Sequence, residues 1–179
     1  MTQIANTYAQ ALYLLAKDEQ QEDMLLQQMK TLEASFAQEP GFLRLLAAHN
    51  LSKEQRCNIL DESFRGKVAP YLLNFLKILT ERGYIRQFPQ CCRAYETHYN
   101  EDHGILPVKV STAVALTQEQ EKRLTEKLEA LTGKRITLEN RVDPQVLGGV
   151  RLDYDGKRMD ATVKSRLDTI AGLLKNTVL

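Results

Sequence analysis

Hydrophobic positions in the first hundred residues recur every three or four residues, the spacing of one face of an α-helix. This pattern predicts helices over 4–17, 19–38, 42–48, 69–82 and 86–102, with a fourth helix in chain order running from a Ser52 cap to Gly66. Pro40-Gly41 separates the second helix from the third, and Ser52 with Gln55 forms a capping box. The first part of the chain is therefore predicted to hold six helices.

After Gly104 the hydrophobic period changes from about four residues to two. Alternating aliphatic and polar residues predict strands over 106–110 and 136–142. Between them, Thr117 and Gln120 form a second capping box that begins a helix, and Gly133 ends it. We place a domain boundary near Gly104.

The Asp155-Gly156 pair predicts a hairpin, since glycine adopts the positive φ that a type I′ turn needs. Folding the chain there sets the following residues opposite each other: Tyr154 and Lys157, Asp153 and Arg158, Leu152 and Met159, Arg151 and Asp160. Two of these pairs carry opposite charges. One apolar face is expected to hold Val150, Leu152, Met159 and Ala161. Asp160 is expected to cap a last helix, which buries Val163, Leu167, Ile170 and Leu174.

Together these elements predict a chain of class α + α/β. An N-terminal six-helix bundle over residues 1–104 is followed by a small C-terminal β-α-β-β-α domain over 105–179.

Two of the predicted helices are apolar over a wide arc, roughly 200° for 4–17 and roughly 220° for 69–82, where one core face needs about 100°. In the first helix, one part of the arc holds Ile4, Tyr8, Ala11 and Leu15, and the next part holds Ala5, Ala9, Leu12 and Ala16. The residues of the second part are small and would let another backbone come close. Either neighbouring helices of the same domain cover these arcs, or part of them is a docking surface.

Composition limits the classes of function. The chain has 179 residues, 43% of them hydrophobic, and a net charge of +1, which gives no support to nucleic-acid binding or a polybasic membrane anchor. No apolar run approaches the roughly 20 residues of a membrane span, and no signal segment precedes the first helix. Cys57, Cys91 and Cys92 are expected to be reduced thiols in a cytosolic, bacterial protein.

No set of residues in the sequence is typical of catalysis. Cys91, Cys92, His98 and His103 do not share one helix face, so we expect no metal site. Gly148-Gly149 lacks the spacing of a phosphate-binding loop. We expect no catalytic residue and no cofactor. The remaining hypotheses are an assembly subunit, an RNA-binding module and, third, an enzyme. Against RNA binding, no strand carries the aromatic, basic RNP1 pattern.

The stretch LGGVRLDYDGKRMDATVKSRLDTIAGLL, residues 147–174, resembles the C-terminal signature of the delta subunit of F-type ATP synthase, the family of the mitochondrial oligomycin-sensitivity-conferring protein. Gly148-Gly149, Met159-Asp160-Ala161, Val163 and Arg166-Leu167 match, whereas Thr162 replaces a Ser and Lys164-Ser165 replaces Arg-Gly. Tyr8–Leu12 resembles the opening helix of the family, and Leu72–Leu76 through Glu81-Arg82-Gly83 resembles its fifth helix, with Tyr84 where Arg is common.

The resemblance implies a non-catalytic stator subunit that ties the catalytic head to the peripheral stalk, so that the head does not rotate with the central shaft. It implies that the N-terminal helix of an alpha subunit binds in a groove of the first and fifth helices. We expect this groove to use Ala5, Tyr8, Ala9, Leu12, Ala16, Leu72, Phe75, Leu76 and Leu79. Ala9→Leu should then fill the groove and weaken binding of the alpha helix, while leaving the melting temperature nearly unchanged.

The resemblance further implies that the C-terminal domain binds the stalk b subunits, for which Lys164 and Arg166 are the candidate contacts. The expected location is peripheral, at the cytoplasmic face of the bacterial inner membrane, with membrane association through the complex. We expect a chain that is monomeric on its own, present in one copy per complex, and without a nucleic-acid partner.

Overall fold

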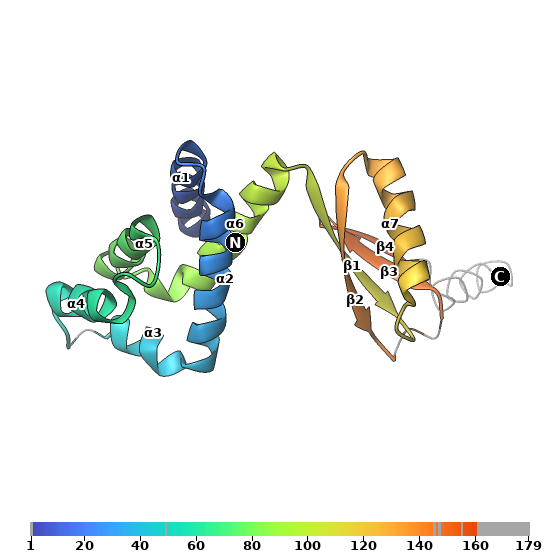
Figure 1. The fold of residues 1–179 in the computed structure, drawn as a ribbon. Coiled ribbons are helices and arrows are strands. Elements are labelled where there is room, and N and C mark those ends of the chain that lie inside the picture. The colour runs from blue at the N-terminus through green and yellow to red at the C-terminus, as the bar shows by residue number, and fades with distance from the viewer. Residues whose placement is uncertain (1, 49, 145, 147, 155, 161–179) are drawn as a thin grey trace, which may run out of the picture. The chain divides into compact units, whose positions relative to one another are not determined.

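The computed structural model describes residues 2–48, 50–144, 146, 148–154 and 156–160. Its contacts divide the chain into two compact units, Met1–Tyr99 and Asn100–Leu179, and each is described by itself. The described residues form seven α-helices and a four-stranded sheet, so the fold mixes α and β structure (Figure 1).

Helices make up the first unit. They are α1 (Gln3–Asp18), α2 (Glu22–Gln38), α3 (Pro40–Leu46), α4 (Lys53–Phe64), α5 (Pro70–Glu81), the 3-10 helix η1 (Ile85–Gln87) and α6 (Phe88–Asp102). Two starting points differ from the prediction. The second helix begins at Glu22 because Gln20 takes a left-handed φ of 55°. The third begins at Pro40, whose fixed φ suits the first helical turn.

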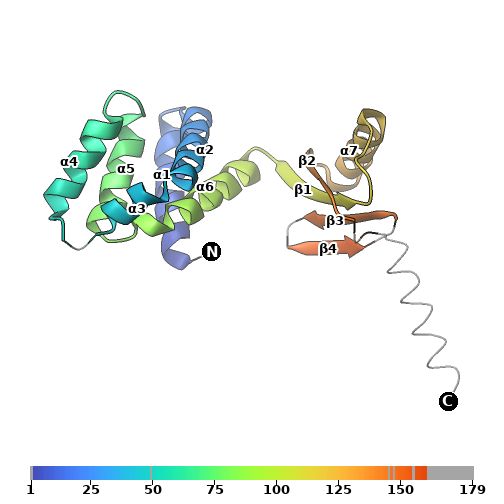
Figure 2. The same cartoon turned by 90° about the horizontal axis from the view of Figure 1, so that it is seen from below.

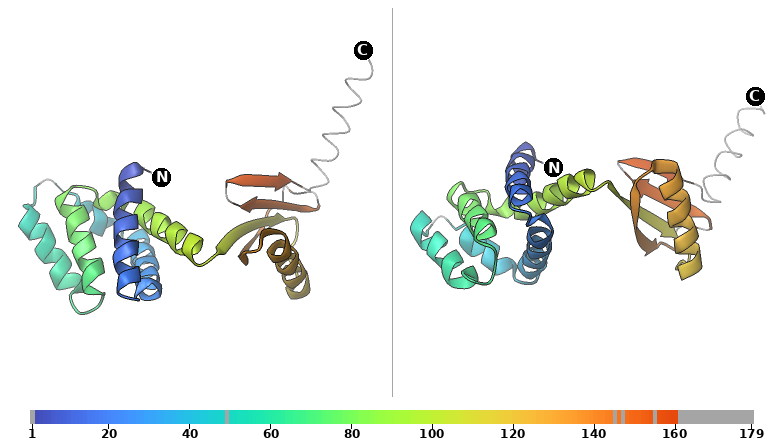
Figure 3. Two further views of the ribbon diagram at one scale, coloured as in Figure 1. Left: turned by 90° about the horizontal axis from the view of Figure 1, so that it is seen from above. Right: turned by 45° about the horizontal axis from the view of Figure 1, so that its top comes forward.

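The first unit is held together around α5, which packs against both α1 and α4. Figure 3 shows α5 between these two helices, and in Figure 2 α1 and α2 lie together. The helix α6 joins this group through Tyr95, whose ring meets the ring of Tyr13 edge-on at 5.4 Å between centroids. Phe36 stacks on Phe42 and meets Phe88 edge-on, which completes an aromatic cluster.

The second unit contains β1 (Ile105–Thr112), α7 (Gln118–Thr132), β2 (Arg135–Val142), β3 (Val150–Tyr154) and β4 (Lys157–Asp160). The strand order is β2-β1-β3-β4, with β1 parallel to β2 and the other pairs antiparallel. The crossover through α7 makes the parallel pair possible. Pro107 lies on β1 before its pairing with β3 begins at Lys109, so its missing N–H breaks no bond to β3.

The predicted register of the hairpin is confirmed: Leu152 lies opposite Met159, and Asp153 opposite Arg158, whose Nε is 2.6 Å from Oδ1 of Asp153. Arg151 stands opposite Asp160 as predicted, and its guanidinium also forms an ion pair with Asp143 at 3.0 Å. The predicted helix with Val163, Leu167, Ile170 and Leu174, the face position of Ala161, and the candidate contacts Lys164 and Arg166 lie outside the described residues.

The sheet has one apolar face and one polar face, as its period of two requires. The apolar face packs against Leu128 of α7 and is formed by Leu106, Val108, Val110, Ile136 and Leu152. On the opposite face lie the residues that alternate with these.

Candidate functional site

An open groove runs between α1 and α5 of the first unit. Its volume is about 310 Å³. The lining residues are Tyr8, Ala11, Leu12 and Leu15 from α1, and Tyr71, Asn74, Phe75 and Ile78 from α5.

The groove exists because each helix presents a second apolar stripe beside the one that enters the core. On α1 the lining positions are spaced three, one and three residues apart, and α5 repeats this spacing, so each set lies on one helix face. The large side chains Leu15 and Ile78 remain 41% and 45% exposed. Among the described residues that line it, Asn74 alone carries an amide. An apolar, solvent-open groove between two helices is the kind of surface that accepts the apolar face of a third helix.

The structure brings three of the predicted groove residues to this surface: Tyr8, Leu12 and Phe75. The others do not line it. They are enclosed in the core with no exposed surface: Ala5, Ala9, Ala16, Leu72, Leu76 and Leu79. The expectation that the small-residue stripe is an open wall is therefore corrected, because these alanines let α1 pack closely inside its own unit.

The sequence reasoning missed five lining residues, namely Ala11, Leu15, Tyr71, Asn74 and Ile78. A signal for the α1 residues was present. Tyr8, Ala11 and Leu15 belong to the other part of the wide apolar arc, which the small-residue stripe leaves outside the core. The apolar arc of α5 is likewise wider than its core contacts need, and Ile78 lies in the part of this arc that stays exposed.

The α5 wall of the groove is fixed from behind by α4. The carboxylate of Asp61 on α4 forms an ion pair with Nζ of Lys77 on α5 at 2.7 Å and a second one with Arg65 at 3.2 Å. The hydrogen bond from Lys77 holds the pKa of Asp61 below its ordinary value, with a further contribution from Arg65. Arg56 of α4 also donates to the carbonyl oxygen of Thr80 at 3.4 Å.

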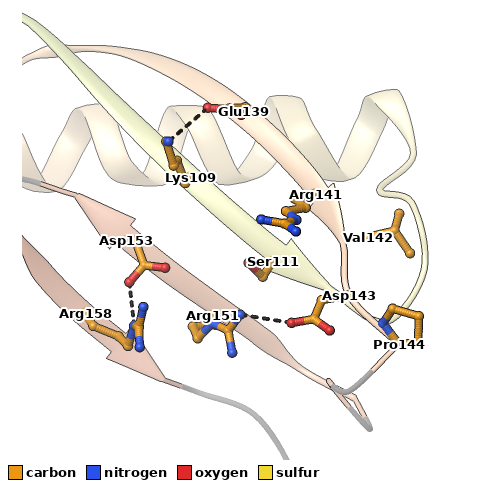
Figure 4. A pocket seen from close by; sticks show the side chains of 10 residues that line it. All are labelled: Lys109, Ser111, Glu139, Arg141, Val142, Asp143, Pro144, Arg151, Asp153 and Arg158. Atoms are coloured by element: carbon orange, nitrogen blue, oxygen red, sulfur yellow. Dashed lines mark hydrogen bonds and ion pairs between the residues drawn. The ribbon is translucent and has the colours of Figure 1, made fainter. Parts of the chain in front are cut away.

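A second, charged pocket of about 430 Å³ lies on the polar face of the sheet in the second unit (Figure 4). Its lining includes four cationic and three anionic side chains: Lys109, Arg141, Arg151, Arg158, Glu139, Asp143 and Asp153. The two pockets differ in character, since the first is apolar and the second is built from ion pairs.

No three His, Cys, Asp or Glu side chains in the described part of the chain are grouped to hold a metal ion. The three cysteines are free thiols. Burial raises the pKa of Cys91 to about 11, and burial also raises that of Cys92, so neither is a thiolate nucleophile at neutral pH.

A helical unit with an apolar groove and a small α/β unit with a charged face are features of proteins that bind partners in an assembly. Residues 4–174 match the family model described as ATP synthase delta (OSCP) subunit. The chain belongs to this family, which confirms the resemblance read from the sequence and decides against the alternative RNA-binding hypothesis.

Relatives extend over nearly the whole chain. It is 29% identical to ATP synthase subunit delta of Clostridioides difficile (strain 630), over 98% of this chain and 97% of the relative. It is 31% identical to ATP synthase subunit delta of Latilactobacillus sakei subsp. sakei (strain 23K), over 96% and 95%. A chain of the Toxoplasma gondii mitochondrial ATP synthase hexamer shares the fold, with a TM-score of 0.74 and 18% identity over 97% of this chain and 98% of that one.

Membership in the family makes the chain a non-catalytic, structural subunit of the ATP synthase, with the stator role that is standard for the family. The complex itself is membrane-associated. Within the residues that the structure describes, no helix combines the length and the apolar character that a membrane crossing requires.

Proposed function

We propose that the chain joins the two parts of the stator through different units. The first unit, a six-helix bundle over residues 1–104, binds the amphipathic N-terminal helix of an alpha subunit in the α1–α5 groove. The second, a β-α-β-β-α domain over 105–179, binds the stalk b subunits. The chain acts in one copy at the cytoplasmic face of the bacterial inner membrane. The observation that carries this proposal is the open apolar groove between α1 and α5.

The side chains at the groove's rim support helix-in-groove docking. An incoming helix would cover Leu15 and Ile78, which are 41% and 45% exposed. Complete burial of an exposed Leu or Ile contributes about 1.5–3 kcal/mol, so covering the exposed part of each contributes roughly 1 kcal/mol. A carboxylate at either position would remove this contribution and would lie unpaired in an apolar interface.

The experiment is a titration of a labelled peptide with the sequence of the alpha N-terminus against the full chain. Leu15→Glu and Ile78→Glu should each weaken binding by roughly tenfold or more, since about 1.4 kcal/mol corresponds to a factor of ten. Leu14→Glu is the matched control, because Leu14 is 54% exposed on the same helix and does not line the groove.

Thermal melting of the three variants should stay close to that of the unmodified chain, because all three positions are exposed. Equal peptide affinity in all three variants would show that the alpha helix does not use this groove. A loss of affinity that is the same for Leu14→Glu would point to general charge repulsion in place of docking.

A further inference from the structure

Three polar residues form a row across the middle of the sheet, on the face that lies away from α7. Ser111 of β1 is in register with Arg141 of β2 on one side and with Arg151 of β3 on the other. Neighbouring strands lie about 4.8 Å apart, so the two arginine backbones are about 10 Å apart with the serine between them. Figure 4 shows the three side chains on the same face of the sheet.

Among the described residues that line the pocket, one cation forms no ion pair. Lys109 pairs with Glu139 at 3.7 Å, Arg151 with Asp143 at 3.0 Å, and Arg158 with Asp153 at 2.6 Å. Each of the three lining carboxylates thus has a cation. Arg141 is exposed and forms no ion pair with any residue in the described part of the chain.

A buried hydrogen-bond donor in the same row is also without an acceptor among the described residues. Nε of Arg151 is buried and has no acceptor among the described residues, although the terminal nitrogen of the same guanidinium binds Asp143. Ser111, which lies between the two arginines in the row, is only 6% exposed. A buried donor without an acceptor is unfavourable, so the row is suited to receive an acceptor from outside.

We propose that the row Arg141–Ser111–Arg151 receives one carboxylate side chain, an Asp or Glu, from the stalk b subunits. This inference rests on the proposed attachment of the second unit to the stalk. A guanidinium matches a carboxylate with two parallel N–H···O bonds, and Arg141 has its fork available.

The charges around the row select a single carboxylate over a polyanion. Glu139, Asp143 and Asp153 line the same pocket and would repel the successive phosphates of a nucleic acid or an anionic lipid surface. One carboxylate would pair with Arg141, which forms no ion pair with a described residue, and would bring no further negative charge. The ion pair with Asp143 holds the side chain of Arg151 in place before the partner arrives.

The test measures binding of the full chain to the purified soluble part of the stalk b subunits by calorimetry. Arg141→Gln should weaken binding by about 5–10-fold, the effect of losing one charge-assisted contact at an interface. Arg135→Gln is the matched control: it removes the same side chain from an exposed position of the same strand, outside the pocket, and should change affinity less than twofold. Raising the salt concentration should reduce the difference between the variants.

The partner group is then found by changing each Asp and Glu of the stalk segment to its amide. One of these changes should weaken binding to the unmodified chain and have no further effect on Arg141→Gln, the non-additivity of a direct contact. If Arg141→Gln binds the stalk as tightly as the unmodified chain does, the carboxylate site is refuted while stalk attachment stands. If the unmodified chain does not bind the stalk, the proposed attachment fails and this inference fails with it.

A lower melting temperature of the isolated Arg141→Gln chain, without a matching change in Arg135→Gln, would also overturn the proposal. It would show that the guanidinium of Arg141 already binds residues of this chain and is not available to a partner.

Discussion

Two alanines of α1, two residues apart, should respond in opposite ways to the same substitution. Ala9 has no exposed surface and lies in the core of the first unit, whereas Ala11 is exposed and lines the α1–α5 groove. Leucine is nearly as good a helix former as alanine, so helix propensity contributes little to either change. The difference between Ala9→Leu and Ala11→Leu therefore reports which side of α1 faces inward.

The expected magnitudes follow from burial. Ala9→Leu forces three extra carbon atoms into a close-packed core, which costs about 1–3 kcal/mol of unfolding free energy. In a unit of this size each kcal/mol lowers the melting temperature by about 4–8 °C. Ala11→Leu adds its side chain to open space and should change the unfolding free energy by less than about 0.5 kcal/mol. It should weaken binding of the alpha peptide, because the added side chain takes up part of the groove.

Urea unfolding followed by circular dichroism measures the first effect, with an unchanged slope as evidence that only stability has moved. Peptide titration at a temperature where both variants are folded measures the second. The reasoning is refuted if Ala9→Leu melts like the unmodified chain and loses the peptide, since the alanine stripe would then be the docking surface and not the core.

Three further outcomes are expected. Asp61→Asn should make the unfolding free energy depend less on pH under acidic conditions. The lowered pKa of Asp61 gives stability that is present above its ordinary value of 3.8 and is lost as pH falls through the lower folded-state pKa. Urea midpoints measured from pH 2 to pH 5 should therefore change less with pH in the variant. Gly133→Ala should cost about 1–2 kcal/mol by urea unfolding, because Gly133 ends α7 at φ 67° and open space around it leaves backbone strain as the cause. Removing residues 105–179 should leave a cooperatively melting first unit that still binds the alpha peptide and no longer binds the stalk; loss of peptide binding in that fragment would contradict the proposed division between the units.

Local sequence signals accounted for most of the elements. Hydrophobic periods of about four and of two residues located the helices and strands, and the capping boxes at Ser52 and Thr117 both formed as predicted. Hairpin register followed from the turn dipeptide and the charge pairs across it, because a one-residue slip would move every side chain to the other face. These features depend on neighbours in the chain, which a single sequence contains.

The direction in which α1 faces could not be read in the same way. Small residues permit close approach by any backbone, so Ala5, Ala9 and Ala16 were compatible with a partner helix and with the protein's own core. Only the three-dimensional packing of the first unit decides between these. The ion pair between Arg151 and Asp143 is another such case. Asp143 directly follows β2, and only the arrangement of the strands in the sheet brings it next to Arg151 of β3.

The outermost of the described strands, β2 and β4, carry the most charge in the sheet. Three of the four residues of β4 are ionic, and β2 bears Arg135, Glu139 and Arg141. An unpaired edge strand can pair with a strand of another chain, and ionic side chains on the edge make such pairing costly. In a large assembly with many chains close together, these charged edges keep the sheet from pairing with a strand of a neighbouring subunit. Contacts with neighbouring subunits are then made by side chains and not by the backbone of the edge strands.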